Sequence, residues 1–220
     1  GGGFYDRYIK KIKKNKKIIT VGLAYSFQKV REIPANKYDI KLDFIITEKE
    51  SWMRILFLGD VVGISGCSKI MNNLLGQIKK YRIDFVIVNG ENAAETGVGI
   101  TKEICEDFFK CGVNVITTGN HVWDQKEIMN FIDKENRLLR PKNLFEPAPG
   151  KGFEVYTTAE NIKVGVLNLM GNVFMKKCDD VFETSAKFID KYKFKEDYDL
   201  LIVDFHGEIT SEKNAIGHFF

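Results

Sequence analysis

The 220-residue sequence predicts an α/β fold built on a mainly parallel sheet, for two reasons. Short β-branched apolar runs alternate with amphipathic helical patterns, which is the arrangement of βαβ units. In addition, four apolar runs end abruptly in polar residues, as buried parallel strands do when they deliver side chains to the carboxyl edge of a sheet. Because ligands of open α/β sheets bind beyond that edge, we expect a functional site there. The four runs span residues 54–58, 85–88, 115–118 and 200–203.

The helices that link these strands are predicted from apolar spacing and capping residues. A single apolar stripe predicts a helix over about 68–81. Thr101 suits the N-cap position of a helix that runs through Phe109, and Asp124 suits the N-cap of a helix that runs to about Lys134. The residues of the stripe are Ile70, Met71, Leu74, Leu75 and Ile78.

Residues 153–169 interrupt the alternation of strand and helix. Two strand patterns in this range meet at a turn formed by Glu160 and Asn161, which predicts an antiparallel hairpin. A helix over about 180–191 and a strand that closes on His206 follow. The hairpin suits a second sheet that packs on the first.

Residues 1–50 differ in pattern from the rest, and we expect them to form a separate, small α/β fragment. A helix follows the first residues, and strands are predicted over 18–24 and 43–48. A polar junction then leads to Met53, which reads as a second natural start of the domain that spans 53–220. The lysine-rich run near the N-terminus could bind nucleic acid, but a solvated helix face is favoured because no aromatic residues are interleaved with it.

Composition and cysteine usage indicate a reduced, cytoplasmic protein with no membrane partner. The net charge of +3 is small and says little about partners. No apolar run reaches the length of a membrane span, and the first residues do not have the pattern of a signal peptide. The four cysteines form no C-x-x-C pair and show no framework spacing, so core packing or incidental exposure is favoured over metal or redox roles.

The polar residues at the strand ends have the chemistry of divalent-metal ligands, since carboxylate, amide and imidazole groups suit Mn, Fe or Zn. Two ions roughly 3.5–4 Å apart need a bridging carboxylate, and Glu91 fits that role. Asp60 could then hold one ion, and Asn120 with His206 the other. Such a pair would bridge a hydroxide and clamp phosphoryl oxygens, which is the chemistry of phosphoester hydrolysis. The candidate ligands are Asp60, Glu91, Asn92, Asn120 and His206.

His121 directly follows Asn120 and is a candidate catalytic residue rather than a ligand. A histidine at the edge of such a site can donate a proton to the leaving alkoxide. The unperturbed titration range of histidine allows that transfer near neutral pH.

Each candidate ligand also has a plain structural reading. Asp60 could cap the loop that follows it, the two asparagines could be turn residues, and His206 could be a core histidine. Glu91 is harder to dismiss, because a carboxylate at the end of a buried strand needs a partner. The occurrence of these groups at four strand ends in one crevice favours the metal site.

An ordered series of motifs covers residues 53–220, and it resembles the YmdB-like metallophosphoesterases of the calcineurin-like superfamily. The resemblance implies a sandwich of two sheets flanked by helices, a dinuclear iron or manganese centre, and activity on phosphodiesters that include 2′,3′-cyclic nucleotides. It implies that the five candidate ligands bind metal and that His121 is the catalytic imidazole. The motifs include Gly59-Asp60-Val61-Val62-Gly63, Asn89-Gly90-Glu91-Asn92, Gly119-Asn120-His121-Val122-Trp123-Asp124, Arg140-Pro141 and Asp204-Phe205-His206.

Two features depart from the family pattern. Val62 stands where many relatives in the wider superfamily have a histidine, and Asn92 would compensate for it. The family also takes two further metal ligands from a Gly-Thr-His-Thr-His segment that lies beyond the position of Phe220. We therefore expect a domain that is incomplete at its C-terminus and that binds metal more weakly.

The first 50 residues carry a second resemblance, to the C-terminal part of 5-formyltetrahydrofolate cyclo-ligase. The matching motifs are Gly1-Gly2-Gly3-Phe4-Tyr5-Asp6-Arg7, Gly22-Leu23-Ala24-Tyr25, Ile33-Pro34 and 43–48. In that family the glycine-rich segment contacts ATP phosphates, which implies a remnant of an ATP/Mg site. An inert remnant is favoured, because the other nucleotide and folate contacts of the family have no counterpart. The candidate ATP contacts are Gly1, Gly2, Gly3, Tyr5, Asp6 and Arg7.

The function predicted from these patterns is metal-dependent hydrolysis of a phosphodiester, such as a 2′,3′-cyclic nucleotide, with His121 as general acid. RNA-derived substrates and a homo-oligomer are left open, and no membrane partner is expected. Two alternatives remain: an inactive fusion or nucleotide-binding regulatory protein, and a remnant of the ATP-dependent cyclo-ligase. Metal content measured together with activity discriminates among them.

Overall fold

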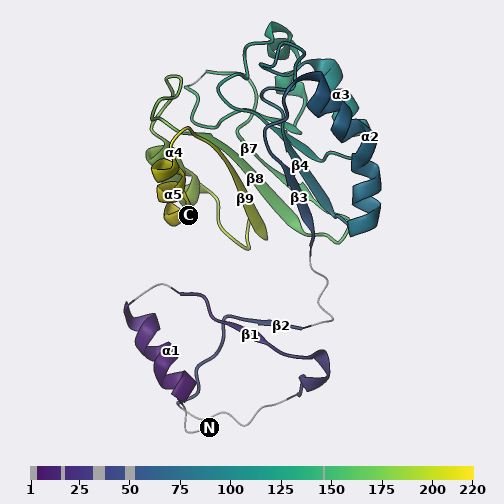
Figure 1. Cartoon of the computed structure of the whole chain (residues 1–220). Coiled ribbons are helices and arrows are strands. Elements are labelled where there is room, and N and C mark those ends of the chain that lie inside the picture. Colours follow the sequence, from purple (N-terminus) through teal and green to yellow (C-terminus); the bar gives the residue numbers. More distant parts are fainter. Residues whose placement is uncertain (1–3, 16–17, 32–37, 48–52, 146) are drawn as a thin grey trace. The chain divides into compact units, whose positions relative to one another are not determined.

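A computed structural model describes residues 4–15, 18–31, 38–47, 53–145 and 147–220. The chain divides into two compact units, Gly1–Trp52 and Met53–Phe220 (Figure 1). The polar junction over 48–52 lies outside the described residues.

The first unit contains one long helix and a two-stranded parallel sheet. Its elements are α1 (Phe4–Asn15), β1 (Val21–Leu23), the 3-10 turn η1 (Ser26–Gln28) and β2 (Phe44–Ile46). Asp43 links them, because its carboxylate accepts hydrogen bonds from Nζ of Lys13 at 2.9 Å and from the backbone N of Thr20 at 2.7 Å. The strands are shorter than expected, since only three residues on each side pair. Among the residues of this unit whose burial is described, none is buried.

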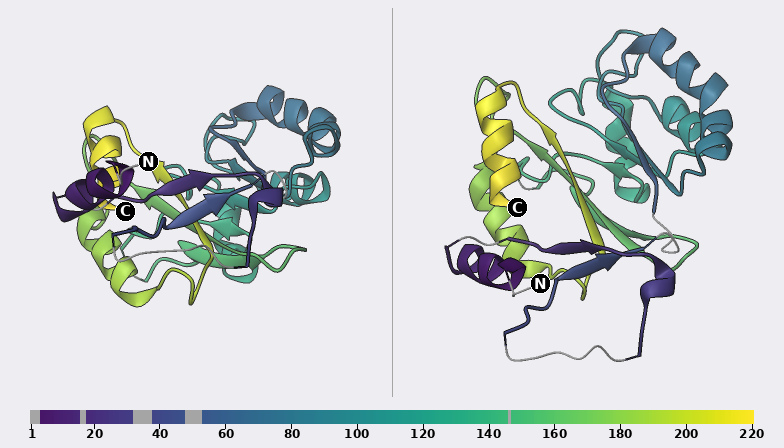
Figure 2. Two further views of the ribbon diagram at one scale, coloured as in Figure 1. Left: turned by 90° about the horizontal axis from the view of Figure 1, so that it is seen from below. Right: turned by 60° about the horizontal axis from the view of Figure 1, so that its bottom comes forward.

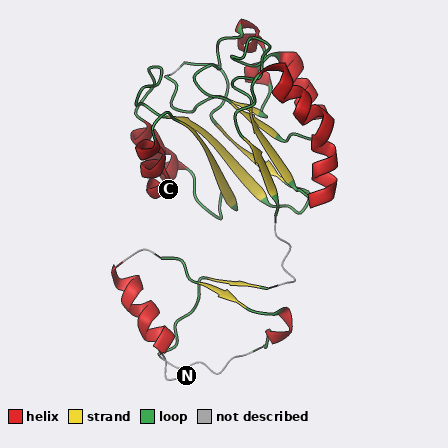
Figure 3. Ribbon diagram, in the orientation of Figure 1, coloured by secondary structure: helices red, strands yellow, loops and turns green. Residues whose placement is uncertain are grey.

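The second unit begins with a four-stranded parallel sheet in the order β3-β4-β5-β6. Figure 3 shows the strands of this unit with helices on either side. Its strands are β3 (Ile55–Leu58), β4 (Phe85–Asn89), β5 (Val115–Thr117) and β6 (Leu138–Leu139). The connecting elements are α2 (Gly63–Tyr81), α3 (Lys102–Lys110) and the 3-10 turns η2 (Lys126–Asn130) and η3 (Ile132–Lys134). The predicted alternation of strand and helix is confirmed for β3, β4 and β5. The sequence does not reveal β6, because two residues are too few to show a periodicity.

The helix starts agree in part with the prediction. Thr101 caps α3 as expected, since its Oγ1 accepts a hydrogen bond from the backbone N of Ile104 at 3.3 Å. By contrast, α2 begins at Gly63, five residues before Ser68, where the predicted helix began. Gly63 has a φ of +58°, a conformation that glycine adopts without strain, and this lets the chain turn directly from the β3 loop into the helix.

The prediction of a helix capped by Asp124 is wrong. The segment that follows Asp124 forms the short turns η2 and η3 instead of one continuous α-helix. The Asp124 carboxylate contacts the ring of His121 rather than a free backbone N–H at a helix start. The same short polar side chain therefore closes a local turn, which is the competing use of Asp at such positions.

The second sheet has three strands in the order β7-β8-β9. The strands β7 (Phe153–Thr157) and β8 (Lys163–Met170) are antiparallel and form the predicted hairpin, with Asn161 at a positive φ of 62° in the turn. The strand β9 (Leu200–His206) then pairs parallel to β8 after the crossover helix α4 (Val181–Lys191). The helix α5 (Thr210–Phe219) follows β9 and is not predicted from the sequence.

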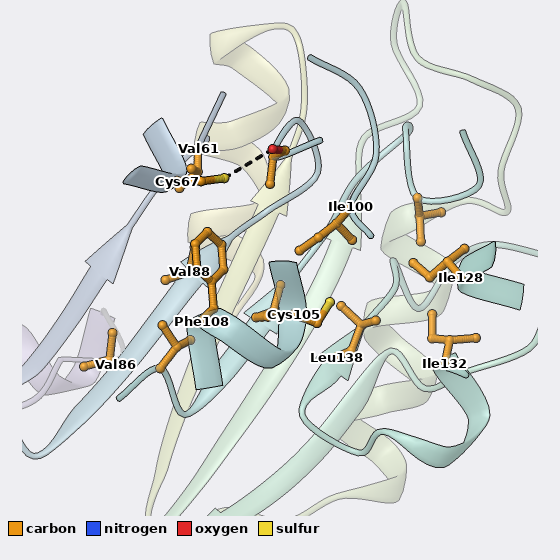
Figure 4. Packing of buried hydrophobic residues seen from close by; sticks show 14 of the residues in the cluster. Val61, Cys67, Val86, Val88, Ile100, Cys105, Phe108, Ile128, Ile132 and Leu138 are labelled. Atoms are coloured by element: carbon orange, nitrogen blue, oxygen red, sulfur yellow. Dashed lines mark hydrogen bonds between the residues drawn. The ribbon is translucent and has the colours of Figure 1, made fainter. Parts of the chain in front are cut away.

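Three apolar clusters show that the two sheets pack face to face between two helical layers. One cluster lies between α2, α3 and the first sheet, a second between the two sheets, and a third between the second sheet and α4 with α5. Figures 1 and 2 show the corresponding layers of helices and strands within this unit. On β4, Val86 and Val88 face the helices around Phe108, as Figure 4 shows, whereas Phe85 and Ile87 face the second sheet. This alternation is the period of two that a central strand requires. The sandwich fold is thus confirmed.

Two further expectations concern the environment of the chain. No helix among the described residues is long and apolar enough to cross a membrane. The four cysteines are free, and three of them, Cys67, Cys105 and Cys111, are buried in the core. These three cysteines therefore pack in the core, whereas Cys178 is partly buried, and Cys67 also donates a hydrogen bond to the carbonyl of Ala93 (Figure 4).

Candidate active site

The five predicted metal ligands come from the carboxyl ends of strands in both sheets. Asp60 follows β3, Glu91 and Asn92 follow β4, Asn120 follows β5, and His206 is the last residue of β9. Because β3, β4 and β5 are parallel neighbours, their carboxyl ends meet at one edge of the first sheet. The sheet-on-sheet packing brings the end of β9 to the same edge.

The five side chains form one continuous series of contacts. Nδ2 of Asn92 donates to Oδ1 of Asp60 at 2.9 Å and to Oε1 of Glu91 at 3.2 Å. The same Oε1 of Glu91 lies 3.1 Å from Nε2 of His206. Nε2 of His206 in turn lies 2.8 Å from Oδ1 of Asn120. The structure thus brings together every residue that the sequence indicated as a ligand.

Glu91 lies at the centre of this series and is almost fully buried, at 2 % exposure. Its Oε2 has no hydrogen-bond partner among the described residues. Burial, together with the negative charge of Asp60, raises the pKa of Glu91 to about 7. A buried carboxylate with a free oxygen is costly, which is why such groups commonly pair with a cation.

Gly119 makes room for the Glu91 carboxylate. A Cβ at Gly119 would lie 1.7 Å from Oε2 of Glu91 and 2.8 Å from Cδ2 of His206. Only a glycine fits at this point, between the carboxylate and the imidazole. The first residue of the Gly-Asn-His motif therefore has a packing reason.

The loop that carries Asp60 is fixed by main-chain hydrogen bonds to the β4 loop. The backbone N of Val61 donates to the carbonyl of Asn89 at 3.0 Å, and the backbone N of Gly63 donates to the carbonyl of Asn92 at 2.8 Å. Asp60 itself has a positive φ of 44°, which costs on the order of 1 kcal/mol for a residue with a Cβ. The Asp60 side chain contacts Asn92 rather than the loop that it could have capped.

His206 is held as a largely desolvated imidazole. Burial lowers its pKa, although the nearby charges of Asp204 and Asp60 act in the opposite direction. Its Nε2 faces two oxygens, one from Glu91 and one from Asn120. A neutral imidazole at this point is in the form that binds a divalent metal.

His121 lies on the turn after Asn120 and pairs with Asp124. Its Nδ1 is 2.5 Å from Oδ2 of Asp124, and Nζ of Lys176 lies 3.3 Å from the other oxygen of that carboxylate. Sequence reasoning assigned Asp124 to a helix cap and so missed this pair. The available signal was the spacing of three residues between a histidine and an aspartate beyond a strand end.

A second supporting carboxylate was also missed. Oδ2 of Asp204, on β9, accepts a hydrogen bond from Nδ2 of Asn89, on β4, at 2.9 Å. Burial raises the pKa of Asp204 above its usual value. Close to the site, Nδ2 of Asn168 on β8 donates to the carbonyl of Thr118 at 2.9 Å. These two contacts join the sheets directly beneath the candidate ligands.

The donor set fits a divalent metal by its chemistry. The fit rests on the buried Oε2 of Glu91, which has no hydrogen-bond partner among the described residues, and on the His206 imidazole and the Asn92 amide, which both contact Oε1 of the same carboxylate. Across the part of the chain that the structure describes, no group of three or more His, Cys, Asp or Glu side chains is arranged for one metal ion. Asparagine amides supply two of the five donors here, so a count of acidic, imidazole and thiol groups alone does not capture this set.

A groove in the second unit and the candidate ATP contacts of the first unit lie outside this set of donors. A groove of about 810 Å³ lies at the amino ends of β4 and β5, away from the candidate ligands, and Arg137 and Tyr156 are among its lining residues. Arg137 forms an ion pair with Glu135 at 2.9 Å. Of the candidate ATP contacts, Gly1–Gly3 lie outside the described residues. Tyr5, Asp6 and Arg7 lie on α1, where Asp6 accepts a hydrogen bond from the backbone N of Ile40 at 3.0 Å.

A two-sheet α/β sandwich that gathers carboxylate, amide and imidazole groups at its strand ends has the architecture of the phosphoesterases. Residues 56–220 match the family described as YmdB-like protein, and the chain belongs to that family. Residues 1–48 match the 5-formyltetrahydrofolate cyclo-ligase family. Both resemblances drawn from the motifs are therefore confirmed.

Individual relatives agree with this assignment. The chain is 42 % identical over 167 residues to a 2′,3′-cyclic-nucleotide 2′-phosphodiesterase of Bacillus subtilis, covering 76 % of this chain and 62 % of that protein. A crystal structure described as a novel phosphatase, from Mycoplasma pneumoniae, is 39 % identical with a TM-score of 0.68, covering 76 % of this chain and 60 % of that one. A hypothetical protein from Thermus thermophilus is 34 % identical with a TM-score of 0.69, covering 76 % and 63 %. The chain thus spans about three fifths of the length of these relatives.

Proposed function

We propose that the unit formed by residues 53–220 hydrolyses phosphodiesters, with 2′,3′-cyclic nucleotides as its substrate class. The observation that carries the proposal is the buried Glu91 carboxylate. Its Oε1 lies within the series of contacts among five side chains from four strand ends, and its Oε2 has no hydrogen-bond partner among the described residues. The name of the Bacillus subtilis relative supports the substrate class. The buried carboxylate and the family match together support the proposed function better than either does alone.

The five donors would hold two divalent ions, of which iron and manganese suit the mixture of oxygen and imidazole groups. Bound ions of this kind acidify water and neutralise charge on phosphoryl oxygens. Glu91 lies between the Asp60–Asn92 contact and the Asn120–His206 contact, so it would contribute a ligand to both ions. The side chains themselves exclude water from one face of the site, since Glu91 is buried beneath them.

His121 is the residue proposed to protonate the leaving oxygen. It is adjacent in sequence to Asn120, and its side chain is 29 % exposed, so a substrate can reach it. A positioned histidine that donates a proton in the transition state contributes about 10²- to 10⁴-fold in rate. The imidazole of His206, by contrast, is turned toward Glu91 and Asn120 and is not available for that role.

The test is hydrolysis of 2′,3′-cyclic AMP by the Mn²⁺-loaded 220-residue chain. We expect turnover by the wild type, a large loss in His121→Ala, and no turnover in Glu91→Gln. The matched control is Glu212→Gln, because Glu212 is also a buried carboxylate but accepts backbone N–H groups from Asn172 and Val173 instead of facing the site. Turnover that is absent in the wild type, or equal in wild type and Glu91→Gln, would refute the proposal.

A further inference from the structure

We propose that Asp124 is a positioning residue: its carboxylate accepts the Nδ1–H of the His121 ring and so holds the ring in the orientation from which Nε2 reaches the leaving oxygen of the substrate. The inference rests on the proposed function, because His121 needs a substrate to protonate. It concerns a residue whose sequence position indicated a helix cap and nothing catalytic.

The contact between the two side chains is short and specific. Nδ1 of His121 lies 2.5 Å from Oδ2 of Asp124. Because the two nitrogens lie on opposite sides of an imidazole ring, a ring whose Nδ1 faces Asp124 must turn Nε2 away from it. The backbone N of Asp124 also donates to the carbonyl of His121 at 3.0 Å, so main chain and side chain close the same turn.

The turn that carries both residues is anchored at its centre and at its end. Val122, between them, is buried at 1 % exposure. Gln125 follows Asp124, and its Nε2 donates to Oγ1 of Thr96 at 3.1 Å and to the carbonyl of Val98 at 2.9 Å. These contacts tie the turn to the loop that follows Glu91 and Asn92. The imidazole is therefore placed relative to the candidate ligands before a substrate binds, as a preorganised acid must be.

The second oxygen of Asp124 has a partner of its own. Oδ1 of Asp124 lies 3.3 Å from Nζ of Lys176, which belongs to the segment between β8 and α4. Hydrogen bonding from His121, reinforced by Lys176, lowers the pKa of Asp124, so the carboxylate is an ionised acceptor. An ion pair this exposed adds little to the stability of the fold. Its effect is on the orientation of Asp124, whose two oxygens are each occupied.

The chemistry requires this arrangement. When the P–O bond to the leaving oxygen breaks, its electron pair stays on that oxygen, which takes the proton from Nε2 of His121. The new P–O bond comes from the attacking water. The acid is the imidazolium form of His121, which carries a proton on each nitrogen. Because Nδ1–H donates to the Asp124 carboxylate, the ring gives up the Nε2 proton and is left as the neutral Nδ1–H tautomer, so the partner on Nδ1 selects the reactive nitrogen.

The experiment compares two substrates that differ in how much their leaving group needs a proton. The ribose oxygen of 2′,3′-cyclic AMP leaves as a strongly basic alkoxide, whereas p-nitrophenolate leaves from bis-p-nitrophenyl phosphate without protonation. We expect Asp124→Ala to lower kcat for the cyclic nucleotide by about 10- to 100-fold and to leave kcat for the nitrophenyl ester nearly unchanged. KM should stay the same for both, and Asp124→Glu should recover part of the loss. Asp107→Asn is the matched control, because Asp107 is an exposed, ion-paired aspartate on α3.

Each outcome decides the inference. An equal loss of kcat for both substrates would assign Asp124 a merely structural role, and an unchanged kcat for both would remove it from the mechanism. If the wild type hydrolyses neither substrate, the proposed function fails, and long-range proton–nitrogen NMR of His121 at about pH 8.5 still tests the positioning claim. There we expect a protonated Nδ1 in the wild type and a mixture of tautomers in Asp124→Ala. The same tautomer in both proteins would overturn the claim.

Discussion

Oε1 of Glu91 lies 3.1 Å from Nε2 of His206, and this contact joins the ends of strands from two different sheets. Glu91 follows β4 in the first sheet and His206 ends β9 in the second. The site therefore depends on how the two sheets pack against each other as well as on the order of strands within each sheet. Substitutions that loosen the packing between the sheets should impair the site even where they touch none of the five donors.

The metal-free protein should lose stability through Glu91 as the pH rises. The pKa of Glu91 is about 7 in the folded chain against an ordinary value of 4.5, so the folded state binds the proton more tightly. Its contribution to stability is complete below about pH 4.5 and is lost as the pH rises through about 7. In EDTA we expect Glu91→Gln to raise Tm over the wild type at pH 8 and to raise it much less at pH 5. A difference in Tm that does not change with pH would contradict this.

The contribution of Asp199 to stability should depend on pH in the opposite direction to that of Glu91. The backbone N–H of Lys163 and the charge of Lys195 lower the pKa of Asp199 below its ordinary value of 3.8. A depressed carboxylate stabilises the fold above its unfolded-state pKa, and this is lost as the pH falls through the folded-state value. Asp199→Asn should therefore lower Tm at pH 7 and lower it much less at pH 3, as measured by thermal unfolding. A deficit of the same size at both pH values would count against the assigned cause.

Gly119→Ala should disrupt the site directly. The new Cβ would lie 1.7 Å from Oε2 of Glu91, so the carboxylate or the chain must move. Overpacking of this kind costs about 1–3 kcal/mol, and we expect Mn²⁺ affinity to fall as well. Gly76→Ala is the control, because no atom lies within 4 Å of a Cβ there and the residue is inside α2. That variant should gain about 0.5–1 kcal/mol in urea unfolding. Equal stabilities of the two variants would refute the packing argument.

Asn89→Ala should destabilise the chain through the contact between the sheets. It leaves Asp204 without the Nδ2 donor that lies 2.9 Å away. Loss of one partner of a buried carboxylate costs about 1–3 kcal/mol. Asn73→Ala offers a comparison, since Asn73 is an exposed residue whose Nδ2 bonds the carbonyl of Lys69 within α2. Surface changes of that kind stay within about 0.5 kcal/mol. We expect the two variants to differ clearly in urea midpoint, and matching midpoints would rule out the contact as a stabilising one.

The sequence predicts the strands and their polar ends because a buried parallel strand consists of consecutive apolar residues that are followed directly by polar ones. The gathering of Asp60, Glu91 and Asn120 at one edge follows from that pattern and from parallel pairing. Two elements are not predicted from the sequence pattern, because β6 has only two residues and α5 has no strong apolar stripe. Both are set by tertiary packing rather than by local periodicity.

The supporting residues could not be predicted for a different reason. The contact of Asn89 with Asp204 spans 115 positions and exists only because two sheets pack in one register. The pairing of Asp124 with His121 is local, but it depends on a turn conformation that competes with an equally reasonable helix cap. Sequence patterns indicate which residue types gather at the strand ends, whereas the partners that orient them require the folded chain.

Calorimetric measurement of Mn²⁺ binding to the 220-residue chain tests most directly the claim that the five side chains form a metal site. We predict about two ions per chain for the wild type, as a paired site requires. Glu91→Gln should lose this binding, and Glu212→Gln should retain it, since Glu212 is a buried carboxylate that accepts backbone N–H groups away from the site. Absence of saturable Mn²⁺ binding by the wild type, or unaltered binding by Glu91→Gln, would contradict the claim that these five side chains form a metal site.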